Sequence, residues 1–263
     1  MRSVLQREFL LNAKLLLLWS FVVGGLGLAC ILLYQSMEGE VASMADAFSN
    51  MGAFSDAFGM STLSIATLEG YFATEVGVVH GIGSGMFAAM IAIGILSKEE
   101  EGHTGEFLLT LPISRSKVVA AKGLCVMICL VGFTTICGLC YVLGFAVLGE
   151  SISWEYFYEF MGLQLLMNVE VGAICFALSA ISGKNRMGLG LGIAMICYVY
   201  DLIGRVVPDL REYLWVGPYA YANASEIFSG AKVKVAALWT AGIVIVLGVG
   251  LAFFLYERRD LAS

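Results

Sequence analysis

The sequence predicts an all-α membrane protein with a single transmembrane domain over residues 1–263. Of the 263 residues, 59% are hydrophobic and only 14% are charged, whereas a soluble domain has roughly 25% charged residues. A spanning helix needs about 20 mostly apolar residues, and runs of this kind occupy most of the chain. What remains between them is too short for a soluble domain of ordinary size.

Six apolar runs are long enough to cross a bilayer. They are residues 15–34, 72–97, 120–148, 157–181, 187–207 and 236–256. Residues 1–14 alternate apolar and charged side chains at roughly helical spacing, which predicts an amphipathic N-terminal helix in the cytoplasmic interface. The connections 35–70 and 208–234 contain apolar and aromatic residues, which are typical of short helices at the outer membrane surface.

The distribution of Lys and Arg predicts the orientation, because cytoplasmic loops of membrane proteins carry an excess of both. With the N-terminus inside, the cytoplasmic segments hold eleven of the 15 basic residues. These are Arg2, Arg7, Lys14, Lys98, Arg115, Lys117, Lys122, Lys184, Arg186, Arg258 and Arg259. The outside keeps Arg205, Arg211, Lys232 and Lys234. We therefore expect both termini to be cytoplasmic, in a multi-pass protein.

A charged segment, Lys98–Lys117, separates the second and third runs. Three consecutive glutamates begin at Glu99, and lipid holds such charges only at heavy cost. The segment therefore lies outside the bilayer, on the cytoplasmic side. Its amphipathic middle, residues 106–111, predicts a helix that docks on a partner, and Pro112 ends that helix.

Two common kinds of site are missing from the sequence. A phosphate-binding loop would read G-x-x-x-x-G-K-[ST], but Gly183-Lys184 is followed by Asn185 and lacks the upstream glycine. If ATP drives this protein, the ATPase is another polypeptide. The seven cysteines all fall inside apolar runs, which argues against a disulfide framework or a metal site.

The charged segment also carries a specific motif. It consists of an acidic pair, a Gly and a Thr, an acidic position, two leucines, then Pro-x-Ser-Arg and a downstream Lys. In this sequence these are Glu100, Glu101, Gly102, Thr104, Glu106, Leu108, Leu109, Pro112, Ser114, Arg115 and Lys122. This run resembles the cytoplasmic signature of type-two ABC exporter permeases, and the six-run layout is similar from end to end. One departure is His103, because Gly and Thr are usually adjacent in that family.

The resemblance implies a cytoplasmic coupling helix between the second and third spans, which inserts into a groove on an ABC ATPase. The residues expected to couple to the ATPase are Glu100, Glu101, Gly102, Thr104, Glu106, Leu108, Leu109, Pro112 and Arg115. It implies two ATPase copies that hold ATP and Mg, a second copy of this chain in a homodimer, and no cofactor or catalytic residue in this chain. It also implies a bacterial cytoplasmic membrane, contact with lipid, no nucleic acid, and export of a peptide, antibiotic, lipid or similar amphipathic cargo.

The fourth run contains buried polar residues. Glu170 lies near its middle, with Gln164 and Asn168 close by, and a carboxyl at that depth faces the bundle interior, a cavity or another subunit. Two interpretations stay open. These residues line the substrate path or a dimer contact, or Glu170 is a protonated acid bonded to a neighbouring helix.

Three other classes compete with an ABC exporter. An ion-gradient transporter would show inverted repeats and broken helices, and an intramembrane enzyme needs paired Glu with Arg and several His in the membrane. Neither pattern is visible, and the chain has only 2 His. A sodium-extruding ABC permease would share the same signature. The sequence does not distinguish a homodimer from a heterodimer.

Overall fold

The fold is all helical, as predicted. The computed structural model describes residues 1–102 and 113–258, and within these ranges every regular element is a helix. Six helical stretches are long and apolar enough to cross a membrane, which confirms the predicted fold class. They are Arg2–Met37, Leu68–Ile93, Arg115–Leu148, Trp154–Ile181, Met187–Val206 and Val235–Arg258.

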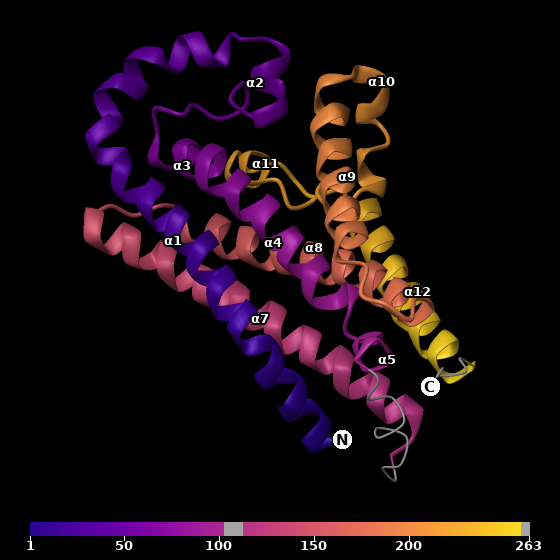
Figure 1. Ribbon diagram of the computed structural model, residues 1–263. Helices are drawn as coiled ribbons and strands as arrows, with labels where there is room; N and C mark the ends of the chain where they lie inside the picture. The colour runs from indigo at the N-terminus through magenta and orange to yellow at the C-terminus, as the bar shows by residue number, and fades with distance from the viewer. Residues whose placement is uncertain (103–112, 259–263) are drawn as a thin grey trace.

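These stretches correspond to the long helices of Figure 1. They are α1 (Arg2–Ser49), α4 (Gly77–Ile93), α7 (Arg115–Leu148), α8 (Trp154–Ile181), α9 (Met187–Val206) and α12 (Val235–Arg258). The short α3 (Leu68–Tyr71) and the π-helical turn η1 (Phe72–Val76) lead directly into α4. The start of α1, the last turn of α12 and α5 (Lys98–Glu101) lie at one end of the bundle (Figure 1), which we call the termini end.

Several helix boundaries differ from the sequence prediction, and two of these differences lie at the termini end. Residues 1–14 do not form a separate interfacial helix, because they are the first turns of α1, which continues unbroken from Arg2 to Ser49. The second span ends at Ile93 rather than at residue 97, and a turn follows. Gly94 starts that turn, where an added Cβ would lie 2.6 Å from the Asn185 side chain. The sequence pattern carried no sign of this close approach.

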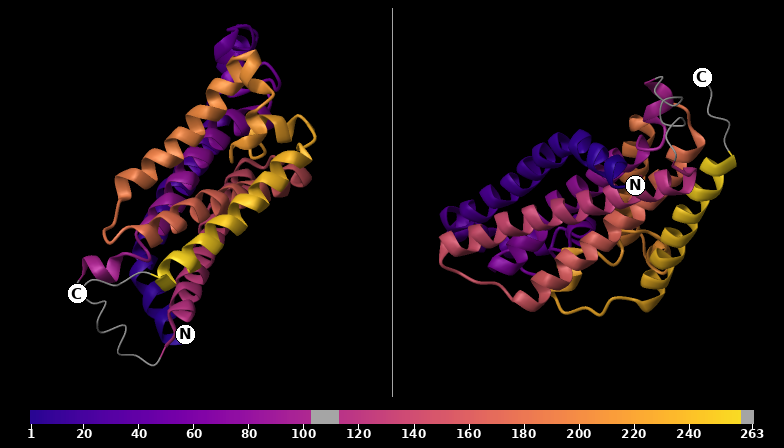
Figure 2. Two further views of the ribbon diagram at one scale, coloured as in Figure 1. Left: turned by 90° about the vertical axis from the view of Figure 1, so that its right-hand side faces the viewer. Right: turned by 90° about the horizontal axis from the view of Figure 1, so that it is seen from below.

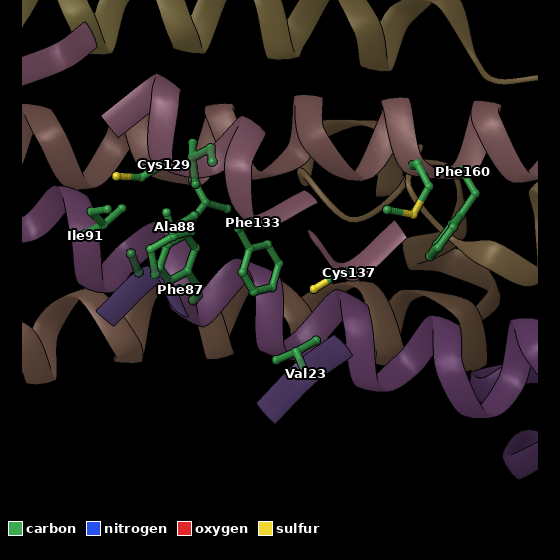
Figure 3. Close-up of a cluster of buried hydrophobic side chains, with 14 of the residues drawn as sticks. Val23, Phe87, Ala88, Ile91, Cys129, Phe133, Cys137 and Phe160 are labelled. Carbon is green, nitrogen blue, oxygen red and sulfur yellow. The ribbon is translucent and has the colours of Figure 1, made fainter. Parts of the chain in front are cut away.

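The core lies between α1, α4, α7 and α8, and its best-defined cluster joins side chains from all four (Figure 3). Phe87 of α4 stacks on Phe133 of α7 with ring centroids 4.7 Å apart. The Trp19 indole of α1 donates a hydrogen bond of 2.6 Å to the Gly83 carbonyl. By contrast, α9 and α12 lie on the outside of the single chain (Figure 2), and only 22% and 17% of the residues in their most apolar stretches are buried.

The opposite end of the bundle is closed by short helices. They are α2 (Ala53–Phe58), α10 (Pro208–Arg211), the 3-10 turn η2 (Leu214–Val216) and α11 (Ala224–Phe228). Gly59 ends α2 with a φ of +74°, and a Cβ there would lie 2.3 Å from Ser225 of α11. A glycine is therefore needed at position 59, both for the positive φ and for the close approach of α2 to α11.

Candidate functional site

The predicted coupling segment is described only at its two flanks. Glu100, Glu101 and Gly102 belong to α5 and its cap, and Arg115 is the first residue of α7. The other five predicted coupling residues lie outside the described residues: Thr104, Glu106, Leu108, Leu109 and Pro112. Their role remains a prediction, and the site is built here from the flanks.

Each flank is bonded to a distant part of the chain. The Asn185 backbone N–H, in the turn between α8 and α9, donates to Glu101 Oε2 at 3.1 Å. Arg115 donates from Nη1 to the Glu257 carbonyl at 3.1 Å, and the Ser116 hydroxyl donates to the Glu257 carboxylate. The two described flanks of the segment are therefore held by the α8–α9 turn and by the end of α12.

Beside α5 lies an ionic group that we call the Lys122 cluster, made of the buried Glu8, Glu99 and Lys122 and the half-buried Lys98. Lys122 Nζ lies 2.5 Å from Glu99 Oε2 and 3.9 Å from Glu8 Oε1, and its side chain is fully buried. It also donates to the Ile95 carbonyl. Lys98 forms an ion pair with Glu8, and the side chains of Glu8 and Glu99 are 2% and 6% exposed.

This cluster draws on three helices, because Glu8 lies on α1, Lys98 and Glu99 on α5, and Lys122 on α7. The sequence interpretation took both lysines as orientation signals, and Lys122 also as the downstream Lys of the motif, but it did not group either of them with acids. One signal could have revealed the cluster: Lys122 is the only charged residue in the run 120–148. A charge embedded in an apolar run must find an opposite charge nearby.

The polar residues predicted on the fourth span lie on α8 and are all buried. Glu170 accepts a hydrogen bond of 2.7 Å from the Tyr221 hydroxyl, in the segment before α11. Burial, and then the nearby Glu170 carboxyl, raise the pKa of Tyr221. The hydroxyl therefore keeps its proton at neutral pH and remains a donor to the carboxyl.

Gln164 and Asn168 lie one turn apart and share a face of α8, whereas Glu170 points elsewhere, since residues two apart on a helix do not share a face. Gln164 donates to the Ala222 carbonyl at 2.8 Å and accepts a longer bond of 3.4 Å from Ser84 of α4. Asn168 is fully buried, and neither its amide nitrogen nor its oxygen has a hydrogen-bond partner among the described contacts. Gln164 and Glu170 therefore bond to neighbouring residues, Ala222 and Tyr221, of the segment before α11, from different faces of α8.

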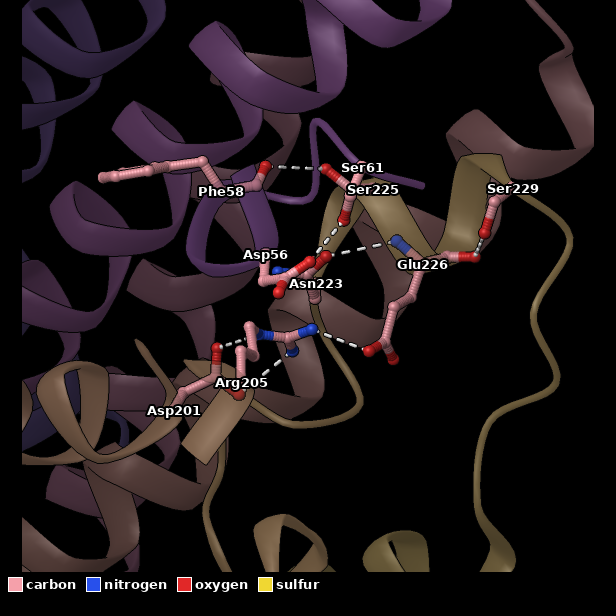
Figure 4. A network of polar contacts seen from close by, with 9 residues as sticks. All are labelled: Asp56, Phe58, Ser61, Asp201, Arg205, Asn223, Ser225, Glu226 and Ser229. Atoms are coloured by element: carbon pink, nitrogen blue, oxygen red, sulfur yellow. Dashed lines mark hydrogen bonds and ion pairs between the residues drawn. The ribbon is translucent and has the colours of Figure 1, made fainter. Parts of the chain in front are cut away.

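A second ionic group, the Arg205 network, consists of Asp201, Arg205 and Glu226 (Figure 4). It lies at the opposite end of the bundle, where α9 approaches α11. Arg205 contacts both carboxylate oxygens of Asp201, at 2.8 and 3.0 Å, one turn earlier on α9. Its Nη1 also donates to Glu226 Oε1 of α11 at 2.6 Å. Asp201 and Arg205 thus form an ion pair one helical turn apart, and Glu226 adds a contact from a second helix.

Among the described residues, no group of three or more His, Cys, Asp or Glu side chains is placed to hold a metal ion. The architecture is therefore that of a helical membrane domain with ionic groups at both ends and a few buried polar side chains between them. No curated protein matches the chain. The family described as ABC-2 family transporter protein matches residues 3–261. The match covers nearly the whole sequence, and so this chain belongs to the ABC-2 transporter family as the membrane subunit of an ABC transporter.

Proposed function

We propose that this chain is the membrane subunit of an ATP-driven exporter and that two copies of a separate ABC ATPase dock on the segment Lys98–Lys117. One observation supports this placement more than any other. The flanks of the segment are bonded to α1, α7, the α8–α9 turn and the end of α12. A partner that displaced the segment would therefore act on most of the bundle at once.

The docking proposal is tested by copurification of the ATPase. Leu108 and Leu109 are the apolar residues that we expect to enter a groove on the partner. Replacing both by Asp should abolish copurification, because a charged side chain would have to be buried in that groove. Leu210→Asp is the matched control, since Leu210 is exposed on α10 at the opposite end. Undiminished association of the double variant would reject the docking site.

We further propose that two copies of this chain assemble around the path. Closed two-fold assemblies are the commonest form of homo-oligomer, and α1, α9 and α12 bury little of their apolar surface in one chain. Single cysteines at Phe21 of α1 or Ile196 of α9, which are 77% and 70% exposed, should give crosslinked dimers in a background without the native cysteines. A complex whose mass contains one copy would contradict this arrangement.

For the cargo, we propose an amphipathic or apolar molecule such as a peptide, antibiotic or lipid. A cavity of about 360 Å³ between α7, α8 and α12 supports this class, because its described lining, including Leu130, Phe176 and Phe253, is apolar throughout. Sodium extrusion is the alternative. Sealed vesicles containing the permease and its ATPase separate the two, because only a sodium pump would build a sodium gradient with ATP and no added organic cargo.

A further inference from the structure

The Lys122 cluster lies at the described start of the proposed docking segment. Lys98 and Glu99 are the first residues of that segment and of α5. Their side chains point inward, Lys98 to Glu8 of α1 and Glu99 to Lys122 of α7. The backbone of this corner is held as well, because Lys122 donates to the Ile95 carbonyl and the Leu96 N–H donates to Ser179 of α8 at 2.9 Å.

The two helices that receive these contacts are long and unbroken. α1 runs for 48 residues without a break after residue 14, and α7 runs for 34 residues. Of all the helix pairs, α1 and α7 share the most extensive contact. A displacement of α5 therefore cannot be absorbed by a bend at the entrance to the membrane, and it acts on both spans along their length.

Stability alone gives no reason for this arrangement. Each buried ion costs several kcal/mol of desolvation, and well-packed apolar residues of similar volume are often as stabilising as a buried ion pair. A charged cluster instead couples the movements of the helices, because every charge keeps its partner only if α1, α5 and α7 move together. Coupling between distant sites is carried by such bonded networks together with rigid helices.

We propose that Glu8, Lys98, Glu99 and Lys122 act as positioning residues that transmit displacement of the docking segment into α1 and α7. This inference rests on the proposed function, since it takes the ATPase as the source of the displacement. Loss of the cluster should therefore separate two properties, binding of the ATPase and control of its rate.

The experiment uses Glu8→Gln in the full permease–ATPase complex. Glu8 belongs to α1 rather than to the docking segment, and Gln keeps the size of the side chain while removing its charge. We expect copurification of the ATPase within twofold of the native level. We also expect the permease-dependent change in ATP hydrolysis, measured per assembled complex, to fall at least fivefold. Glu226→Gln, which removes an acid from the opposite end, is the matched control and should leave both measurements unchanged.

Each outcome decides something different. If the native permease does not copurify with an ATPase, the proposed function fails before the inference is reached. If the Glu8→Gln complex assembles and still changes the ATPase rate to the native extent, the cluster is purely structural and the inference is wrong. Should Glu8→Gln fail to fold, the double variant Glu8→Gln with Lys98→Gln keeps the cluster neutral. The same rate per assembled complex then supports or rejects the inference.

Discussion

The two ends of the bundle hold ionic groups of different construction. In the Lys122 cluster, the partners come from α1, α5 and α7, and Glu99 and Lys122 are 23 positions apart in the sequence. In the Arg205 network, the bidentate pair of Asp201 and Arg205 lies within one helix, and only Glu226 comes from another element. The first group exists only when three helices are docked. The second persists on α9 even if α11 moves away.

The central lysine of the Lys122 cluster is also more buried than the outermost acid of the Arg205 network. The Lys122 side chain is fully buried between Glu99 and Glu8, whereas the Glu226 side chain is 44% exposed. Removing one member of a buried pair leaves the other charge uncompensated, which is far more costly than losing an exposed contact. The comparison predicts an ordered series of stability losses, from the termini end to the opposite end.

The largest loss is expected for Lys122→Met. This change leaves the buried carboxylates of Glu8 and Glu99 with Lys98 as their remaining cation in the cluster. We expect the free energy of unfolding to fall by about 3–5 kcal/mol, measured by denaturant unfolding in detergent. Lys117→Met is the control, because Lys117 is exposed on the same helix and its loss should have little effect. Equal losses for the two variants would mean that the cluster is not energetically coupled.

A smaller loss is expected for Arg205→Lys. Lysine keeps the positive charge beside Asp201 but replaces the two-pronged contact, at 2.8 and 3.0 Å, by a single ammonium that cannot reproduce its geometry. The expected reduction in the free energy of unfolding is about 1–2 kcal/mol, in line with loss of one charge-assisted hydrogen bond. If Arg205→Lys destabilised the chain as much as Lys122→Met, the contrast between the two ends would be lost.

For Glu226→Gln we expect a change of less than about 1 kcal/mol, because ion pairs with a solvent-exposed partner contribute little. The Asp201–Arg205 pair stays within α9, so no buried charge is left alone. Thermal unfolding at low and high salt provides the measurement. A native protein that loses stability with salt while the variant does not would show that the Glu226 contact is screened as an exposed one.

The difference between the ends also marks the limit of prediction from sequence. The Asp201–Arg205 pair was predictable because the two residues are one helical turn apart. The span positions were predictable from the lengths of the apolar runs. The Lys122 cluster was not, because its members are spread over residues 8 to 122 and meet only through the packing of α1 on α7. In the same way, nothing in the local sequence indicated that Tyr221 would reach Glu170.

Glu170 sharpens the comparison because it is a buried carboxyl with a hydroxyl rather than a cation as its described hydrogen-bond partner. Glu170→Gln should give the smallest stability change of the series, since the new amide oxygen can still accept from Tyr221 at nearly the same place. Chemical denaturation and ATPase copurification should both remain close to native. A large loss of folded protein would instead place Glu170 among the residues required for packing.

Transport is where the same substitution should have an effect. Placing a charged side chain at the centre of a membrane helix costs roughly 2.5–3.5 kcal/mol for Asp on insertion scales, and a similar value is expected for Glu, so stability alone does not account for this residue. If Glu170 contributes to the path or the dimer contact, Glu170→Gln should reduce export or cargo-stimulated ATP hydrolysis severalfold while Tyr221→Phe, which removes only the donor, changes it less. Native export by Glu170→Gln would leave Glu170 as a buried acid bonded to Tyr221, the second interpretation that the sequence allowed.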